Sequence, residues 1–238
     1  MPTPSSRPSA RLVWLFDVDG TLLVTDGAAR EAFAFAAREC LGVDDDLQGI
    51  AFAGRTDPLI LADILARHGR TAADGLAERF WSTACARMEV LLAPARGRVL
   101  AGVPALLARI GEEPGWIRGL LTGNTGVMAA LKLGHYGLAD HFVFGAFGDQ
   151  AADRDALARS AVAHAGRTWG VPPGRCVVVG DTEHDVACAR AAGAQAVAVA
   201  TGGRSRAELE RCHPDLLLDD LADPAGLLEW AGAISRGA

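Results

Sequence analysis

Residues 12–21, which read LVWLFDVDGT, decide how this chain folds. Five consecutive apolar residues predict a short strand that is buried on both faces, because a half-exposed strand would alternate with polar residues. The strand ends in an acidic turn, where Asp17 and Asp19 are separated by one residue. Two buried carboxylates are unfavourable without compensation, so this stretch predicts a bound cation at the end of the first strand.

Similar apolar runs recur along the chain and alternate with helical patterns. We expect further strands at 117–121, 142–144, 176–179 and 196–199, and a weaker one at 216–218. Helices are expected over 103–110, 128–133, 156–165 and 186–192, and the tail after Trp230 is expected to fray. This alternation predicts an α/β fold, a Rossmann-like parallel sheet with helices on both faces.

The segment 25–98 has a different pattern. It contains no convincing strand, and its apolar residues recur at helical spacing, as in Phe33, Ala36, Ala37 and Cys40. We therefore expect an inserted all-helical cap domain over 25–98, with 1–24 and 99–238 forming the α/β core.

Composition limits the partners and the compartment. The chain has 238 residues, 50% of them hydrophobic, and a net charge of −6, which argues against nucleic-acid and anionic-membrane partners. The five cysteines form no C-x-x-C pair, and the first ten residues lack the apolar stretch of a signal peptide. We expect a cytoplasmic protein, and the oligomeric state stays open.

Two later motifs follow predicted strands. Residues 121–125 read LTGNT, where the Thr122 hydroxyl and nearby backbone N–H groups can cradle an anion or serve as an ordinary helix cap. Residues 177–185 read VVVGDTEHD, and a helix that begins near Thr182 would turn Asp185 back toward Asp181. Because ligands bind at the carboxyl ends of the strands in open α/β sheets, these motifs and the first turn point to one site.

Lys132 is the only lysine in the sequence and follows the second motif on a predicted helix. A compact ammonium differs from the planar guanidinium that the chain uses everywhere else, so its presence indicates a specific role. The alternative is an ordinary surface lysine.

Together, DVDGT at 17–21, LTGNT at 121–125, Lys132 and GDTEHD at 180–185 resemble the ordered motifs of the haloacid dehalogenase (HAD) superfamily. The resemblance spans roughly residues 11–205 and is closest to the phosphoglycolate-phosphatase-like branch, which carries a helical cap. It implies a Mg²⁺-dependent phosphatase that hydrolyses a small phosphorylated metabolite, a phosphoglycolate-like phosphomonoester, through an aspartyl-phosphate.

The resemblance also implies roles for individual residues. Asp17 would be the nucleophile and a metal ligand, and Asp19 the general acid/base that also binds the metal through its backbone carbonyl. Thr122 would hold the phosphoryl oxygens. Asp181 would complete the Mg²⁺ site, with Asp185 supporting it directly or through water.

The sequence departs from many relatives in one region. They carry a K-P-x-P sequence shortly before the strand of the last motif, whereas residues 148–155 read GDQAADRD and contain no lysine. Lys132 is the favoured phosphate-stabilising cation, and Arg154 is the competing candidate.

Four residues are expected to bind substrate: Gly20, Gly123, Asn124 and Arg55. Arg55 lies in residues 53–58, AGRTDP, which resemble the cap loop that faces the catalytic site. It could bind a second anionic group such as a carboxylate through a bidentate contact, or else pair with Asp57 at a helix start.

Other functions remain as alternatives. A phosphosugar mutase uses the same pair of acids, whereas a haloacid dehalogenase needs neither a metal nor an acid at the position of Asp19. A non-catalytic binding protein on the same scaffold would be expected to lack Asp17 or Asp19. A dinucleotide-binding enzyme is disfavoured, since no G-x-G-x-x-G follows the first strand.

Overall fold

The computed structural model describes residues 11–72, 74–93 and 96–237. Within them, six parallel strands form one sheet in the order β5-β4-β1-β6-β7-β8, so the α/β fold expected from the sequence is confirmed. The strands are β1 (Leu12–Phe16), β4 (Trp116–Thr122), β5 (Phe144–Phe147), β6 (Cys176–Gly180), β7 (Gln195–Val199) and β8 (Leu216–Leu218).

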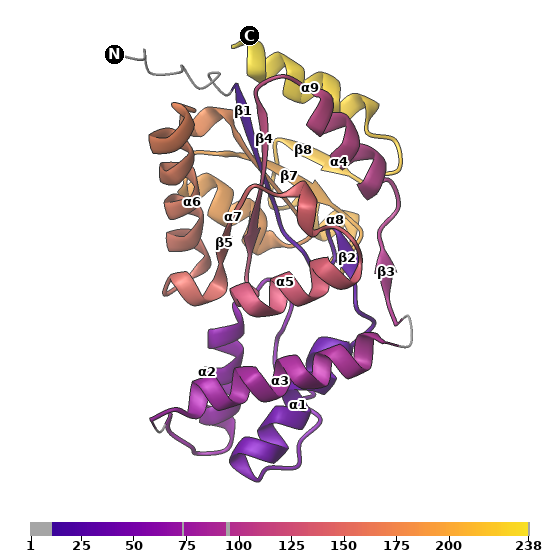
Figure 1. Ribbon diagram of the computed structural model, residues 1–238. Helices are drawn as coiled ribbons and strands as arrows, with labels where there is room; N and C mark the ends of the chain where they lie inside the picture. Colours follow the sequence, from indigo (N-terminus) through magenta and orange to yellow (C-terminus); the bar gives the residue numbers. More distant parts are fainter. Residues whose placement is uncertain (1–10, 73, 94–95, 238) are drawn as a thin grey trace, which may run out of the picture.

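Strand β1 lies inside the sheet, which explains its uninterrupted apolar sequence. Leu12, Trp14 and Phe16 pack on one face, and Val13 and Leu15 pack on the other. Helices α4 and α9 cover the first face and α6 and α7 the second, as Figure 1 shows. The helices of this part are α4 (Val103–Glu112), α5 (Gly126–His135), α6 (Arg154–Trp169), α7 (Glu183–Ala191), α8 (Arg206–Glu210) and α9 (Ala225–Arg236).

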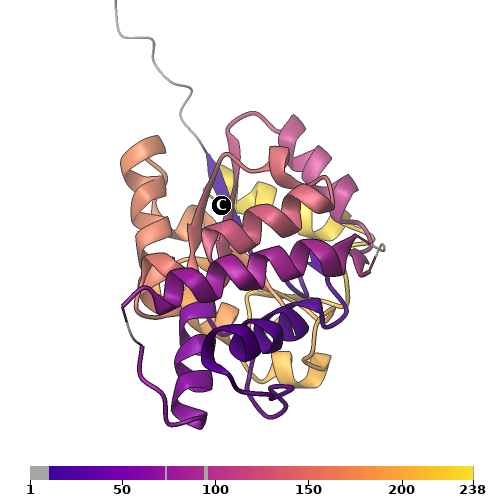
Figure 2. The same ribbon diagram turned by 60° about the horizontal axis from the view of Figure 1, so that its bottom comes forward.

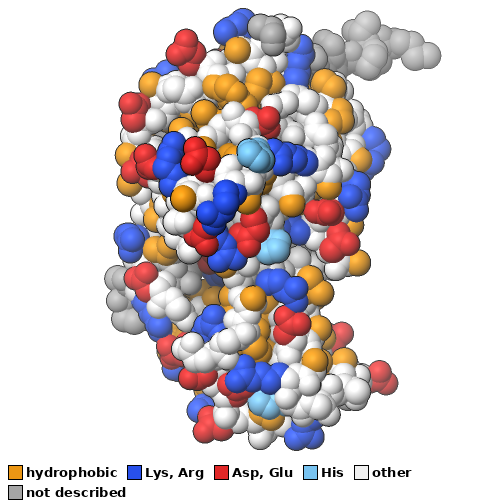
Figure 3. Space-filling model, turned by 180° about the vertical axis from the view of Figure 1, so that it is seen from behind, with side chains coloured by type: hydrophobic (Ala, Val, Ile, Leu, Met, Phe, Trp, Pro, Cys, Tyr) orange, Lys and Arg blue, Asp and Glu red, His pale blue; other side chains and the backbone are white. Residues whose placement is uncertain are grey.

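The remaining helices, α1 (Ala28–Leu41), α2 (Asp57–Arg67) and α3 (Leu76–Leu92), gather at one end of the sheet (Figures 1 and 2). They share an apolar core that includes Phe33, Ile64 and Phe80, and Met128 of α5 joins it. The surface narrows between this helical part and the sheet part (Figure 3). Helices α1, α2 and α3 are the helices and strands that the structure describes between residues 25 and 97, and the domain boundaries stay a prediction. Every helix in the described residues is too short or too polar to cross a membrane.

Two short strands connect the parts. Strand β2 (Leu23–Val24) pairs antiparallel with β3 (Arg98–Val99), so the chain enters and leaves the helical part side by side. The sequence did not predict this pair, because two residues are too few to show a strand periodicity.

Two expectations were wrong in detail. The strand predicted at 142–144 begins only at Phe144, and the Phe142 ring instead lies 6.2 Å from that of Phe16, so its apolar character reflects core packing. The tail after Trp230 is not frayed but continues α9, where Ser235 accepts a hydrogen bond from Trp116 Nε1 at 3.2 Å. The other strands lie where predicted, and the other predicted helices are present with shifted ends.

Candidate active site

The sequence motifs meet at the carboxyl edge of the sheet. Because β4 and β6 flank β1, the residues at the ends of these strands, Asp17, Thr122 and Asp181, lie close together. A cavity of about 390 Å³ opens at this edge, between the strand ends and the helical part. Its lining includes Asp17, Asp19, Gly20, Thr122, Gly123, Asn124, Lys132 and Asp181 from the sheet part, and Arg30, Phe52, Arg55 and Asp57 from the helical part.

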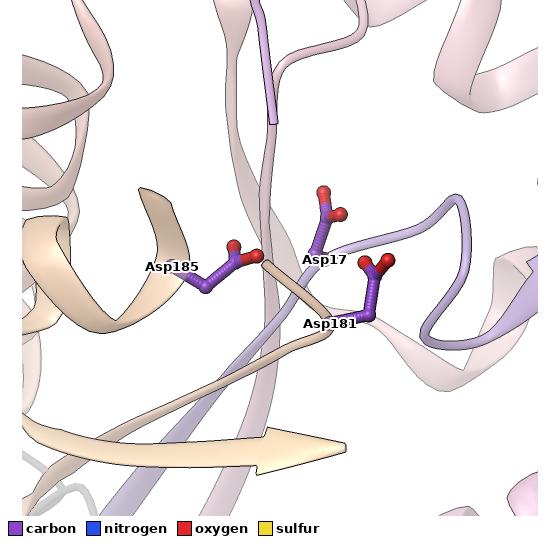
Figure 4. Close-up of side chains that lie close together, drawn as sticks. All are labelled: Asp17, Asp181 and Asp185. Carbon is purple, nitrogen blue, oxygen red and sulfur yellow. The ribbon is translucent and has the colours of Figure 1, made fainter. Parts of the chain in front are cut away.

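Three buried carboxylates converge beside this cavity, from Asp17, Asp181 and Asp185 (Figure 4). One oxygen from each lies within 4.8 Å of the others. Burial, with the negative charges of the other acids, raises the pKa of Asp17 to about 6 and that of Asp181 to about 8. Arg154 is the cation in contact with the cluster, 3.2 Å from Asp17 Oδ1 and paired also with Asp185.

The charge and ligand chemistry of this cluster fit a divalent cation. When all three carboxylates are ionised, the one guanidinium that contacts them among the described residues leaves two negative charges uncompensated. Asp181 forms no ion pair within the described residues, and Thr21 Oγ1 donates a long hydrogen bond of 3.4 Å to it. A Cβ at Gly20 or Gly202 would clash with the Asp181 carboxylate, so two glycines let backbone close around it. Carboxylate oxygens in this arrangement match the preference of Mg²⁺ for hard ligands.

Asp185 is oriented by the start of α7. Its Oδ2 accepts hydrogen bonds from Thr182 N at 3.0 Å and Thr182 Oγ1 at 2.7 Å, and its Oδ1 accepts one from Arg154. This reciprocal cap holds the carboxylate toward the cluster, as the sequence spacing predicted.

A second polar cluster surrounds Lys132, which is only 2% exposed, so the surface position considered from the sequence is wrong. Lys132 Nζ lies 2.8 and 2.6 Å from the two carboxylate oxygens of Asp19 and 2.7 Å from Asn124 Oδ1. Asn124 Nδ2 in turn donates to Asp19 Oδ2 and to Thr122 Oγ1, each at 2.8 Å. Because Thr122 Oγ1 accepts this bond, its own proton remains available to a ligand.

The helical part contacts the second motif through hydrogen bonds between Asp57 and backbone groups of that motif. Asp57 N donates to Gly123 O at 2.7 Å, and Thr125 N donates to Asp57 Oδ2 at 2.7 Å. A Cβ at Gly123 would clash with the carbonyl oxygen of Arg55, so glycine is required for this close approach. Burial raises the pKa of Asp57 to about 6, against the lowering effect of Lys132 and the Thr125 N–H.

Asp57 is the residue that the sequence interpretation missed. It was considered only as a partner for Arg55, because Asp at a helix start is an ordinary cap. The structure pairs Arg55 Nη2 with Asp63 Oδ2 at 2.6 Å, so the Arg55–Asp57 pairing held open above is wrong.

Arg154 lies behind the carboxylates, whereas Lys132 lines the cavity. The sequence does not show which of the two cations faces the cavity, because that position depends on how the folded chain packs.

Known proteins of one family are similar to this chain over most of its length. A family model described as HAD-hydrolase-like matches residues 154–224. The phosphoglycolate phosphatase of Agrobacterium fabrum (strain C58) is 30% identical over 248 aligned positions, covering 98% of both chains. The phosphoglycolate phosphatase of Xanthomonas campestris pv. campestris (strain 8004) is 30% identical over 194 residues, covering 80% of this chain and 83% of the relative.

Solved structures share the fold. CbbY from Rhodobacter sphaeroides, in complex with phosphate, aligns with a TM-score of 0.72 at 24% identity, covering 90% of this chain and 96% of that one. A hydrolase from Pseudomonas syringae aligns with a TM-score of 0.72 at 22% identity, covering 92% and 98%. At these identities the likeness extends to the fold alone.

Proposed function

The chain belongs to the haloacid dehalogenase-like hydrolase family and is a phosphatase, and we propose that it hydrolyses a small phosphorylated metabolite through a covalent intermediate on Asp17. A phosphomonoester related to phosphoglycolate is the proposed substrate, as the names of the relatives suggest. One observation carries the proposal. The buried Asp17 carboxylate opens into the same cavity as the Thr122–Asn124 anion cradle and Lys132.

The proposed cofactor is Mg²⁺. Asp17 and Asp181 would hold it with their carboxylates and Asp19 with its backbone carbonyl. When bound, the ion would neutralise the cluster and polarise a phosphoryl oxygen. Both oxygens of Asp185 already accept hydrogen bonds from Thr182 and Arg154, which supports a role for Asp185 in orienting the site or in binding through water.

Asp17 would act as the nucleophile. One of its oxygens forms a bond to phosphorus while the bond to the ester oxygen breaks, and water later cleaves the aspartyl-phosphate. Arg154, 3.2 Å from Asp17 Oδ1, favours the ionised carboxylate that this attack requires. Since an anion here attacks another anion, cationic groups around the phosphate are essential.

Asp19 would move the protons. It would donate one to the leaving alkoxide and later take one from the attacking water. Lys132 and Asn124 both hydrogen-bond to Asp19, which fixes its carboxylate beside the cradle. Backbone groups at Gly20 and Gly123 line the same space and would contact the substrate together with the Thr122 hydroxyl.

The different positions of Lys132 and Arg154 support different roles for them. Lys132 lines the cavity, which supports a direct contact with the phosphoryl group. Arg154 lies among the carboxylates, which supports a role in holding Asp17. We further propose that residues 25–98 act as a cap that excludes water and selects the substrate, and that the protein is cytoplasmic.

The test is phosphate release from a panel of phosphorylated metabolites, with Mg²⁺ and with EDTA. Activity that requires both Mg²⁺ and Asp17, with Asp17→Asn as the control, is the expected result. A mutase would instead return an isomeric sugar phosphate without free phosphate. Failure of every panel member to release phosphate would overturn the proposed function.

A further inference from the structure

Two guanidinium groups line the helical wall of the cavity, Arg30 of α1 and Arg55 of the loop before α2, and their charges are balanced differently. Arg55 pairs with the Asp63 carboxylate at 2.6 Å, so a neighbouring anion already compensates its charge. Arg30 forms no ion pair with any described residue. Its Nη1 donates to the backbone carbonyls of Leu47 and Ile50, the latter at 3.2 Å. Because these acceptors are neutral, the positive charge of Arg30 remains available to a ligand.

Arg30 is also fixed in place before any ligand binds. Its Cζ lies 4.3 Å from the centroid of the Phe52 ring, which itself lines the cavity. Phe52 is held in turn by Phe33 of the helical core, with ring centroids 5.5 Å apart. A guanidinium held on one face and at one nitrogen loses little freedom on binding, so less of its binding energy is lost to ordering.

The remaining edge of Arg30 suits a carboxylate. Its Nε and Nη2 donate no hydrogen bond to any described residue. These two N–H groups are parallel in a guanidinium and match the two oxygens of a carboxylate. Ala29 and Ile60 of the same wall are apolar. The other charged residues of this wall already have partners, since Arg55 pairs with Asp63 and Asp57 accepts a hydrogen bond from Thr125 N.

Arg30 and the phosphate-binding groups belong to different parts of the chain. The cradle and Lys132 come from the sheet part, whereas Arg30 comes from the helical part that faces it across the same cavity. A volume of about 390 Å³ is at the small end of ligand pockets, so one compact ligand can contact both walls. The two walls therefore favour a ligand with a phosphate at one end and a second anion at the other.

We propose that Arg30, seated on Phe52, is the specificity-determining residue for a carboxylate on the phosphomonoester substrate. The proposal rests on the phosphatase function above and gives to Arg30 the role that the sequence suggested for Arg55. Arg55 is instead assigned to the cap loop, which it braces through Asp63.

The test compares matched pairs of substrates. Each pair has one phosphate ester of an ω-hydroxy acid with two, three or four carbons and the ester of the diol of equal length, so that the series also measures the reach of Arg30. The readout is the ratio of kcat/KM for the carboxylated ester to that for the hydroxyl ester. Arg30→Gln is expected to lower this ratio at least ten-fold at the length that the wild type prefers. Arg30→Lys keeps the positive charge but lacks the two parallel N–H groups of a guanidinium, so it should recover part of the ratio.

Arg55→Gln is the matched control, because it removes the other guanidinium of the same wall. It is expected to change kcat/KM for both esters by the same factor. The melting temperature of each variant shows whether the helical part still folds. A ratio that Arg30→Gln leaves at the wild-type value, or a selective loss in Arg55→Gln instead, would overturn the proposal while the phosphatase function stands.

The subsite can also be tested without turnover. If the wild type releases no phosphate from any of these esters, calorimetric titration with the same ester pairs tests the subsite alone, and the metabolite panel decides the proposed function. Tighter binding of the carboxylated ester that Arg30→Gln abolishes would support the subsite. Equal binding of both esters by the wild type would overturn it.

Discussion

Replacement of Asp17 by Asn is expected to stabilise the metal-free protein. In the fold, the pKa of Asp17 is raised from 3.8 to about 6, because burial and the neighbouring acids disfavour its charged form despite Arg154. Below pH 3.8 the group is protonated in both the folded and the unfolded chain, and its ionisation does not affect stability. Between pH 3.8 and about 6 the unfolded chain has lost this proton while the folded chain still holds it, so the native stability falls as the pH rises across this range and levels off above it.

The size of the effect follows from the two pKa values. The difference between 3.8 and about 6 corresponds to about 3 kcal/mol at pH 8, at about 1.4 kcal/mol for each pKa unit. The same linkage gives about half of that at pH 5. For a chain of this size, about 3 kcal/mol corresponds to a melting temperature higher by about 6 to 12 °C for Asp17→Asn in EDTA at pH 8.

The assay is thermal unfolding of wild type and Asp17→Asn at pH 8 and pH 5, each in EDTA and in excess Mg²⁺. Saturating Mg²⁺ should remove or reverse the difference, because the wild type gains the binding energy of the ion and the variant lacks one ligand. A variant that melts at or below the wild type in EDTA at pH 8 would refute the uncompensated charge of the carboxylate cluster. A difference that does not shrink at pH 5 would refute its assignment to the ionisation of Asp17.

Two further substitutions test the neighbouring groups. Lys132→Met should lower kcat at least 100-fold, because it removes the ammonium that lines the cavity and holds both oxygens of Asp19; a loss of less than ten-fold at an intact fold would assign the phosphate contact elsewhere. Asp57→Ala should lower the free energy of unfolding by about 1–3 kcal/mol, because it leaves the buried Thr125 N–H without its acceptor. Asp57→Asn keeps an oxygen there and should recover the loss fully in chemical denaturation at pH 8, because it also removes a buried carboxylate whose pKa is raised to about 6. Equal losses in the two variants would exclude the hydrogen bond as the cause.

Most strands of the sheet could be predicted from the apolar runs in the sequence. Strand β1 is apolar at every position because helices cover both faces of the sheet, and that burial leaves a direct trace in the sequence. Strand β5 was misplaced because Phe142 is apolar for a different reason, its packing on Phe16 beyond the strand end. The pair of β2 and β3 left no trace, since each strand has two residues.

The position of the candidate site was predictable for a topological reason. Parallel strands bring their carboxyl ends to one edge, so the residues after β1, β4 and β6 had to meet once the strands were recognised. The convergence of Asp17, Asp181 and Asp185 follows from that rule and from the capped start of α7.

The sequence by itself determined the α/β class, the helical insertion and the acids at the strand ends, because each depends on local pattern or on strand direction. Only the tertiary structure decided which charges are compensated. In the fold, Arg154 lies among the carboxylates, and Arg55 forms an ion pair with Asp63. Asp57 accepts a hydrogen bond from Thr125 N, which links the two parts of the chain. The fold also placed Arg30 on Phe52 without an anionic partner among the residues that the structure describes. These pairings depend on distances between segments far apart in the sequence, and no local pattern encodes such distances.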